Sequence, residues 1–529
     1  MDDPFRQVID PSQMDAYRSH NWAAFQNLKC KANREIWRAK RAFFEKKSKS
    51  AKGMWSYVNM ERGKNKQGLS SLSGSYSSLN DALEALNVHF CEVMHPSSDL
   101  STFSELPDDS WLPSFSVVDI WQDLKRLPCK ATGSDDIPTK LYKKAALILA
   151  EPLHFLISEC ITQRRFPSAW KIADVVPVPK TKGSTVEEYR PLSLLPIPAK
   201  LCESIILRNM KTQFTDLLGD NQFGIRKYSS TTDAIIANHD SMTKHADDPE
   251  IGASILITFD FSKAFDRIDH RKLVQKMLNM QLPAGFLRLL VDYLKHRKQR
   301  VRANGQKSYP KNVTSGVAQG SLLGPFLFGM FISSLQPIHA ETNMVKYVDD
   351  VSIVVPVRTN FVINDLQCIG SELKNIYSWS YSNGLTLNQS KTSGLIYSRG
   401  QFKQINDIQS SLSDVQFKSS VRFLGVILDD NLRWKSHVDF LVKKCSQRMY
   451  ILRRLRSVTS HEEFFTIYRG LIRSLLEYAC PAFIGLSSTE STRLQAIQKR
   501  CLKIKGCNDA PVLASNILNI CLIVRHPNE

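Results

Sequence analysis

Two patterns of hydrophobic and polar positions alternate along the middle of the chain. Between about residues 115 and 430, apolar residues at helical spacing alternate with short runs of β-branched residues. This alternation is typical of an α+β body. Just before it, Leu83, Leu86 and Phe90 fall on one face of residues 80–95, which predicts a short amphipathic helix.

Changes in this pattern divide the chain into five expected regions. The chain has 529 residues, more than one hydrophobic core usually organises. Residues 68–78 are rich in Ser and Gly, which predicts a flexible linker. We expect a basic helical N-terminal region at 1–67, a linker and short helix at 68–114, the α+β body at 115–430, a helical region at 431–505 and a tail at 506–529.

Positive charge is the compositional feature that changes this picture most. Lys and Arg total 70 against 51 Asp and Glu, which gives a net charge of +19. Residues 29–66 alone contain 13 Lys or Arg and 3 Glu, interleaved with aromatic residues such as Trp37, Phe44 and Tyr57. Cations and stacking rings together suit single-stranded nucleic acid. The alternative, which fits the pattern equally well, is a solvated helix whose aromatic stripe packs on the next domain.

Several classes of protein fit the sequence poorly. The first residues, MDDPFRQVID, are acidic and polar, unlike a secretory signal. The longest apolar stretch, around residues 322–332, is short and interrupted by Gly and Pro, so we expect no membrane span. The 11 cysteines lack CxxC spacing, so we expect neither a zinc site nor a disulfide framework. We therefore expect an intracellular protein, with nucleus and cytoplasm both open.

Aspartates follow apolar runs at two places in the body. The run ILITF ends at Asp260, and helix-like sequence starts near Lys263. In a second segment, two β-prone runs flank Asp349 and Asp350 as in a hairpin with acids at its tip. Converging carboxylates repel one another, and a divalent cation such as Mg²⁺ relieves that conflict. A lone Asp-Asp pair is usually a solvated hairpin tip. The motifs around it must therefore distinguish a metal-binding site from an ordinary turn.

Those motifs, taken in order, resemble the reverse transcriptases of non-LTR (LINE-type, jockey-like) retrotransposons. FDFSKAFDRIDH, SGVAQGSLLGPFLFGMFI and KYVDD resemble the family's first three palm motifs. LNQSKTSGLIYS and FLGVILDDNLRWKSH resemble its fourth and fifth. Upstream, VVPVPKTKGSTVEEYRPLSLLP and NQFGIRKYSSTTDA resemble its fingers. The resemblance implies a right-hand polymerase, with fingers and palm at 115–430 and a helical thumb at 431–505.

The resemblance also implies a catalytic centre with two Mg²⁺ ions. Asp260 and Asp349 would bridge both ions, with Asp350 beside them in a weaker or electrostatic role. The backbone carbonyl of Phe261 would complete one coordination shell. Lys391 resembles the family's proposed general acid for the departing pyrophosphate, against the alternative of a solvated lysine.

The nucleotide-binding residues follow from the same resemblance. Phe265 stands where the family carries a ring that excludes a ribose 2′-hydroxyl; the alternative is a core Phe that anchors the following helix. Gln319 and Gly320 lie in the loop that touches the nucleotide and the template base. Lys180 and Arg190 resemble the finger cations that grip the triphosphate, although Lys182 competes with Lys180 and a surface salt bridge is the alternative role.

Other acids and cations have simpler roles. We expect Asp266 and Asp269 to cap the start of a helix. Residues 295–305 predict a basic strand and turn. The cations expected to hold the template–primer backbone are Arg300, Arg302, Lys443, Lys444, Arg448, Arg453 and Arg454.

The resemblance implies an RNA-directed DNA polymerase that uses an RNA template, a DNA primer and dNTPs. The alternatives are a catalytically inactive remnant that still binds nucleic acid and a product that folds poorly. No endonuclease-like sequence precedes residue 30, and the tail lacks a clear family ending, so we expect a truncated element without its endonuclease.

Overall fold

The computed structural model divides the chain into two compact units. The first comprises Met1–Gln67 with Arg433–Glu529, and the second comprises Gly68–Leu432. Part of the predicted linker at 68–78, Lys182 and the tail from residue 507 lie outside the described residues. The structure describes residues 11–63, 72, 74–96, 99–104, 106, 111–129, 131–180, 185–360, 363–398, 405–483 and 485–506.

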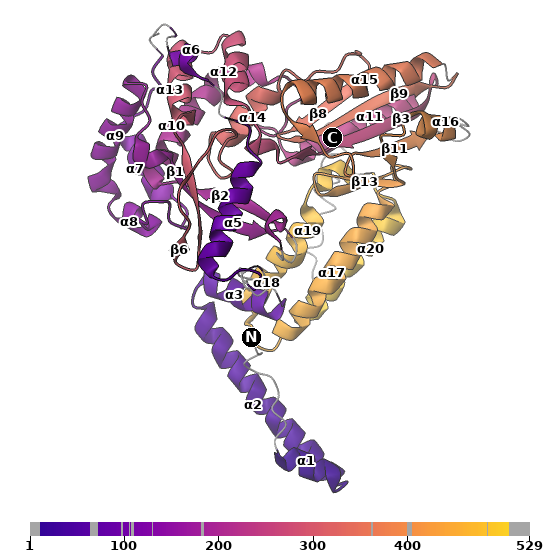
Figure 1. Ribbon diagram of the computed structural model, residues 1–529. Coiled ribbons are helices and arrows are strands. Elements are labelled where there is room, and N and C mark those ends of the chain that lie inside the picture. The colour runs from indigo at the N-terminus through magenta and orange to yellow at the C-terminus, as the bar shows by residue number, and fades with distance from the viewer. Residues whose placement is uncertain are drawn as a thin grey trace, which may run out of the picture. The chain divides into compact units, whose positions relative to one another are not determined.

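The larger unit contains a five-stranded sheet, here called sheet II, with the strand order β12-β11-β3-β9-β8. Its centre is β3, whose apolar side chains are buried along almost its whole length because both neighbouring strands and packed helices cover it. The helix α11 (Thr231–Asp247) contacts β3, β8 and β9 (Figure 1). The strands are β3 (Ile251–Phe259), β8 (Asn343–Tyr347), β9 (Asp350–Arg358), β11 (Ser393–Ser398) and β12 (Gln416–Phe417).

A second mixed sheet, sheet I, has the order β2-β1-β5-β6, with β7 paired to β5. The predicted basic strand and turn are confirmed: β5 and β6 are joined by Asn304 and Gly305, both at positive φ, as a tight hairpin requires. The helix α5 (Leu79–Glu92) packs on β5, β6 and β7 through Leu83, Leu86 and Phe90, as predicted. The strands are β1 (Ile172–Pro179), β2 (Tyr189–Leu194), β5 (Lys298–Ala303), β6 (Gln306–Lys307) and β7 (Lys311–Asn312).

Helices bury sheet II in one large hydrophobic core, whereas Val175, Tyr189 and Val301 of sheet I form a smaller cluster with α5. Two small two-stranded sheets complete the unit: β4 (Phe261–Ser262) with β10 (Thr386–Leu387), and β13 (Ser420–Phe423) with β14 (Val426–Asp429). The remaining helices of the unit are α6 (Ser101–Ser104), α7 (Val117–Arg126), α8 (Thr139–Lys144), α9 (Ala146–Thr162), α10 (Ile197–Phe214), α12 (His270–Asn279), α13 (Ala284–Leu294), α14 (Gly324–Ile332), α15 (Ile363–Ser382) and α16 (Ile405–Ser411).

The expected helix start near Lys263 is wrong. Lys263 has a left-handed backbone (φ 51°), and a short 3-10 turn follows before α12 begins at His270. The chain bends here because its carbonyls pair with a second loop: Gly316 donates to Ile268 O at 2.8 Å and Val317 to Phe265 O at 2.8 Å. Asp269 caps α12 by accepting from Lys272 N, as predicted, whereas Asp266 lies outside the helix.

The smaller unit is helical. Its N-terminal helices share a core with its C-terminal ones, and that core contains Phe44 and Tyr57, both fully or almost fully buried. Trp22 and Trp37 stay exposed at 54% and 38%. The packing alternative therefore holds for Phe44 and Tyr57, and the stacking alternative remains open for the other two rings. The helices are α1 (Pro11–Arg18), α2 (Trp22–Ser48), α3 (Ala51–Glu61), α17 (Lys435–Leu455), α18 (His461–Tyr468), α19 (Ser474–Glu477) and α20 (Ser488–Lys503).

Among the described residues, no helix has the length and apolar character that a membrane crossing requires.

Candidate active site

Sheet II brings the three candidate aspartates to one edge. The strand β3 pairs with β9 up to Phe259 opposite Val351, so Asp260 and Asp350 are the next residues at the adjoining strand ends. Tyr347 pairs with Asp350, which leaves a two-residue loop of Val348 and Asp349. The sequence interpretation of an acid-tipped hairpin beside a strand-end aspartate is therefore confirmed.

A neighbouring segment braces the hairpin loop. Val348 has φ 58°, an unfavourable conformation for a β-branched residue. The buried Gln222 accepts from both Val348 N and Gly224 N at 3.0 Å. A Cβ on Gly224 would lie 2.7 Å from Val348 N, so only glycine fits without a shift. The sequence placed this NQFG segment with the fingers; its contact with the hairpin depends on tertiary pairing between Gln222 and Lys346.

A cavity of about 540 Å³, here called the aspartate pocket, collects most of the predicted site. Of the predicted catalytic and nucleotide-binding residues, Asp350 and Gly320 do not line it. Gly320 packs instead against the backbone of β2, where an added Cβ would lie 2.5 Å from Ser193 O. The predicted residues that line the pocket are Lys180, Arg190, Asp260, Phe261, Phe265, Gln319, Asp349 and Lys391.

The aspartates influence one another's charge. Burial and the charge of Asp260 raise the pKa of Asp349, while its own backbone N–H and Arg190 act against the shift. Burial, Asp349 and Asp260 raise the pKa of Asp350 to about 6, with Lys391 opposing. The Lys391 ammonium donates to Asp260 Oδ2 at 3.0 Å and so balances one of the three charges.

The pocket meets part of the requirement for a metal ion. Among the described residues, no group of three or more His, Cys, Asp or Glu side chains is close enough to hold an ion. Mg²⁺, however, typically uses only one or two carboxylates together with substrate phosphates. Asp260 and Asp349 line the same pocket and repel each other electrostatically, so this donor set fits a divalent cation that a nucleotide helps to hold.

Phe265 lies where both of its sequence interpretations place it, and its exclusion of a ribose 2′-hydroxyl stays a prediction. Its ring lines the aspartate pocket and stacks on Phe328, with centroids 5.1 Å apart and an interplanar angle of 21°. Phe261 is buried and pairs in register with Leu387 through β4 and β10.

The pocket carries more basic side chains than the sequence indicated. Lys263 and His89 also line it, with Lys263 Nζ 3.1 Å from His89 Nε2. Burial and nearby cations lower the pKa of Lys180 and of Lys263, and burial and Lys263 lower that of His89. Cations that disfavour one another's charge are stabilised by a polyanion. No local sequence pattern marks His89 for this pocket, because it reaches the pocket from α5, far away in sequence.

Two residues predicted to bind nucleic acid are held by ion pairs in the fold. Arg300 donates to the fully buried Asp174 at 2.6 Å, and Arg302 contacts the same carboxylate at 3.1 Å. Each is also hydrogen-bonded to the chain between 132 and 136. These contacts assign both guanidiniums a structural task within sheet I, and their binding of nucleic acid stays a prediction.

The cations of α17 divide into two groups. Arg448 donates to Leu471 O at 2.6 Å, and Arg454 pairs with Glu61 at 2.8 Å. Lys443, Lys444 and Arg453 are exposed. This exposed group is available to a ligand, so the prediction of phosphate contacts rests chiefly on these three residues.

Acids at adjoining strand ends, close to clustered cations, are the kind of arrangement that phosphoryl or nucleotidyl transfer uses. Residues 178–428 match the family "Reverse transcriptase (RNA-dependent DNA polymerase)", and this part of the chain is a reverse transcriptase domain. The match confirms the sequence resemblance and the right-hand polymerase fold class. Enzymes of this family generally depend on a divalent metal.

The chain is similar to several curated proteins of insect mobile elements. It is 26% identical over 409 residues to "Probable RNA-directed DNA polymerase from transposon BS" of Drosophila melanogaster, covering 73% of this chain and 44% of that one. It is 24% identical over 400 residues to "RNA-directed DNA polymerase from mobile element jockey" of Drosophila funebris, covering 72% and 43%. The chain thus spans less than half the length of these relatives.

Solved structures with some likeness include telomerases. The telomerase from Candida tropicalis in complex with a TWJ fragment of telomeric RNA has a TM-score of 0.37 at 12% identity, covering 72% of this chain and 66% of that one. The corresponding Candida albicans complex has a TM-score of 0.35 at 13% identity, covering 73% and 71%.

Proposed function

We propose that this chain catalyses RNA-directed DNA synthesis. The observation that carries the proposal is the aspartate pocket, where Asp260 and Asp349 face Lys180 and Arg190 across one cavity. A primer 3′-hydroxyl would attack the α-phosphate of a dNTP, forming the new phosphodiester bond and releasing pyrophosphate. The relatives' printed names, from non-LTR mobile elements, support the same activity.

The proposed cofactor is Mg²⁺, as two ions. Asp260 and Asp349 would hold them, with the Phe261 carbonyl and Asp350 as further or purely electrostatic contributors. When bound, such ions activate the attacking oxygen and stabilise the leaving one. The raised pKa of Asp349 supports a cation here, because Asp260 is part of its cause.

The chain's own residues have separate tasks in this proposal. Lys180 and Arg190 bind the triphosphate, joined by Lys263 from the turn after β4. Phe265 rejects a ribose 2′-hydroxyl by contact. Lys391 leaves Asp260 when the site is filled and supplies a proton to the departing pyrophosphate.

The proposed macromolecular partners are an RNA template and a DNA primer. The exposed cations Lys443, Lys444 and Arg453 support phosphate contacts that do not depend on base sequence. We propose an intracellular location, because these partners are found inside cells.

Primer extension on an RNA template with Mg²⁺ tests the proposal. We expect the chain to extend the primer, EDTA to abolish extension, and Asp349→Ala to lower kcat by at least ~10³-fold. Asp407→Ala, which removes an exposed acid from α16, is the matched control and should match the unaltered chain. Equal extension by the chain and Asp349→Ala would disprove the assigned site.

A second candidate function is binding of nucleic acid without catalysis. The observation that favours it is the pairing of Lys391 with Asp260, which occupies one proposed metal ligand. This candidate predicts salt-sensitive RNA binding with no extension by the chain at any Mg²⁺ or Mn²⁺ concentration.

A further inference from the structure

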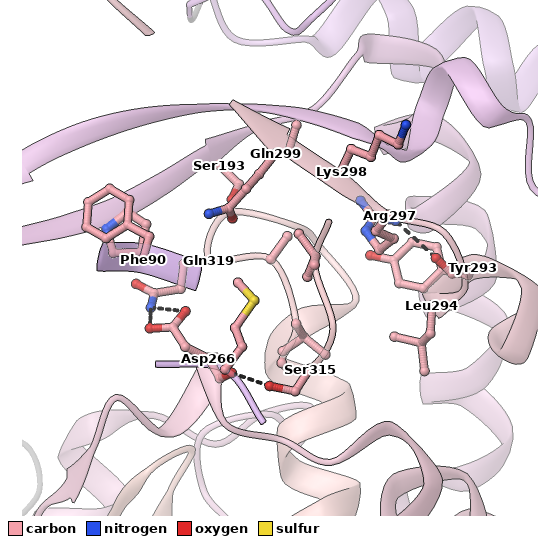
Figure 2. Close-up of a pocket in the computed structure, with 17 residues that line it drawn as sticks. Phe90, Ser193, Asp266, Tyr293, Leu294, Arg297, Lys298, Gln299, Ser315 and Gln319 are labelled. Carbon is pink, nitrogen blue, oxygen red and sulfur yellow. Dashed lines mark hydrogen bonds between the residues drawn. The ribbon is translucent and has the colours of Figure 1, made fainter. Parts of the chain in front are cut away.

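Asp266, the carboxylate six residues after Asp260, has no part in the mechanism above. The sequence assigned it to a helix cap, yet it lines the aspartate pocket. Gln319 Nε2 donates to both of its carboxylate oxygens, at 2.9 and 2.8 Å. Figure 2 shows the Gln319 amide turned toward this carboxylate.

The backbone around both residues is fixed by close contacts. Ser315 Oγ donates to Asp266 O at 2.9 Å, as Figure 2 also shows. Gly316 lies so close that an added Cβ would be 2.6 Å from Asp266 O, and its φ of 79° disfavours other residues. The loop at 315–319 is therefore joined to the segment at 265–268, and the side-chain pair of Asp266 and Gln319 closes this connection.

Burial makes the ionised form of the Asp266 carboxylate unfavourable. Burial raises the pKa of Asp266 to about 6, while Gln319, Lys263 and Lys180 act against the shift. Among the hydrogen bonds of the described residues, those to this carboxylate come from a neutral amide. A half-buried acid held by a neutral donor beside a substrate pocket is typical of a functional residue.

The geometry also determines which atom of Gln319 faces a ligand. An ionised carboxylate can only accept hydrogen bonds, so the donor atom Nε2 of the amide must point to Asp266. The amide oxygen then projects away from Asp266 as the acceptor left for a ligand. If Asp266 were absent, the amide could rotate and present either atom.

We propose that Asp266 is a positioning residue that fixes the Gln319 amide so that its oxygen accepts a hydrogen bond from the incoming nucleotide. The ligand class is a nucleoside triphosphate with a hydrogen-bond donor on its sugar or base. This inference rests on the proposed nucleotide pocket. It adds Asp266 as the residue that orients the Gln319 amide within that pocket.

Steady-state primer extension at varied dNTP tests the pair. We expect Asp266→Asn and Gln319→Ala each to raise the KM for dNTP about tenfold, because the Gln319 amide is no longer held in the orientation that binds the nucleotide. The kcat should stay within threefold, because the proposed metal ligands Asp260 and Asp349 are unchanged. The double variant should also show about a tenfold increase, because the two residues act as one unit. Asp266→Glu, which keeps the carboxylate, should recover part of the loss.

Asp269→Asn is the matched control. It changes an acid three residues away that caps α12 and should leave KM unchanged. A double variant whose KM rises about a hundredfold, or Asp266→Asn with an unchanged KM, would refute the proposal.

Equilibrium binding separates this inference from the polymerase proposal. Fluorescence anisotropy of a base-labelled dUTP with the full chain and Mg²⁺ gives Kd without turnover. If the chain extends no primer but the single and double variants all weaken Kd about tenfold, Asp266 positions Gln319 and the polymerase proposal alone fails. If the chain extends primers and Kd is the same in all variants, the positioning role is wrong.

Discussion

Three carboxylates, Asp260, Asp349 and Asp350, lie close together at and beside the adjoining ends of β3 and β9. Nearby cations offset their negative charges to different degrees. Lys391 pairs directly with Asp260, whereas Asp349 and Asp350 keep raised pKa values. At this scale the site consists of opposed charges that a nucleotide and divalent cations would neutralise together.

The ring of Phe265 is expected to decide the choice between dNTPs and rNTPs. Phe265→Val should raise kcat/KM for rNTPs relative to dNTPs by at least about tenfold, because a branched side chain leaves room for a 2′-hydroxyl. Loss of the stack on Phe328 should also lower the free energy of unfolding by roughly 1–2 kcal/mol. Single-nucleotide extension measures the ratio, and Phe265→Tyr, which keeps the ring, should retain discrimination. An unchanged ratio in Phe265→Val would leave Phe265 with a core role only.

Nucleotide affinity should depend on pH through Asp266. Its pKa of about 6, raised by burial against Gln319, Lys263 and Lys180, means that the acid is ionised at pH 7.5 and largely protonated at pH 5.5. A protonated carboxyl no longer accepts two N–H groups, so the KM for dNTP should rise about threefold by pH 5.5. The ratio of KM in Asp266→Asn to KM in the unaltered chain should shrink correspondingly as pH falls. A constant ratio would show that Asp266 does not titrate in this range.

At the scale of elements, short loops at the ends of strands determine where the candidate catalytic residues lie. The hairpin β8–β9 holds Asp349 on a strained two-residue loop, and the segment at 221–224 supports that loop. Much of this scale was predictable: β-branched runs before Asp260 and around Asp349 indicated strands, and Leu83, Leu86 and Phe90 indicated α5. The bend at Lys263 was not predictable, since the pairing of Gly316 and Val317 with the segment at 265–268 produces it.

The support of the hairpin can be tested at Gly224. Gly224→Ala should reduce kcat by about 10–100-fold, because the new Cβ displaces Val348 and with it Asp349. Gly370→Ala is the matched control, since an added Cβ in α15 meets nothing within 4 Å and removes a helix-weakening glycine. Activity and circular dichroism of both variants should show loss of rate in Gly224→Ala without loss of fold. Normal activity of Gly224→Ala would mean that the loop tolerates displacement.

At the scale of the whole molecule, residues from the two ends of the chain form one compact unit. Phe44 of α2 is fully buried in a core built mainly from residues 441–504. Phe44→Ala should lower the free energy of unfolding of this unit by about 3–5 kcal/mol. Trp37→Ala, which truncates an exposed ring of the same helix, should cost less than about 1 kcal/mol. Chemical denaturation followed by tryptophan fluorescence measures both, and equal small losses would argue against a shared core.

The exposed cations of α17 should govern the salt dependence of nucleic-acid binding. Replacement of Lys443, Lys444 and Arg453 by Gln should reduce the slope of log K against log salt by about 2 to 3, because three phosphate contacts and their released counterions are lost. The control removes three exposed cations elsewhere, at Lys125, Lys140 and Lys144, and should leave the slope unchanged. Filter binding of an RNA–DNA hybrid over a salt series measures the slope. Equal slopes in all three proteins would place the binding surface elsewhere.

The sequence by itself determined the order of the motifs, the α+β body and the position of Asp260 and Asp349 next to strand ends, because strand periodicity and charged strand ends are local properties of the chain. Tertiary structure alone decided that Asp266 holds Gln319, that Gln222 and Gly224 support Val348, that His89 reaches the pocket from α5, and that Asp174 binds Arg300 and Arg302. Each of these is a contact between segments distant in sequence, and no local pattern encodes such a partner.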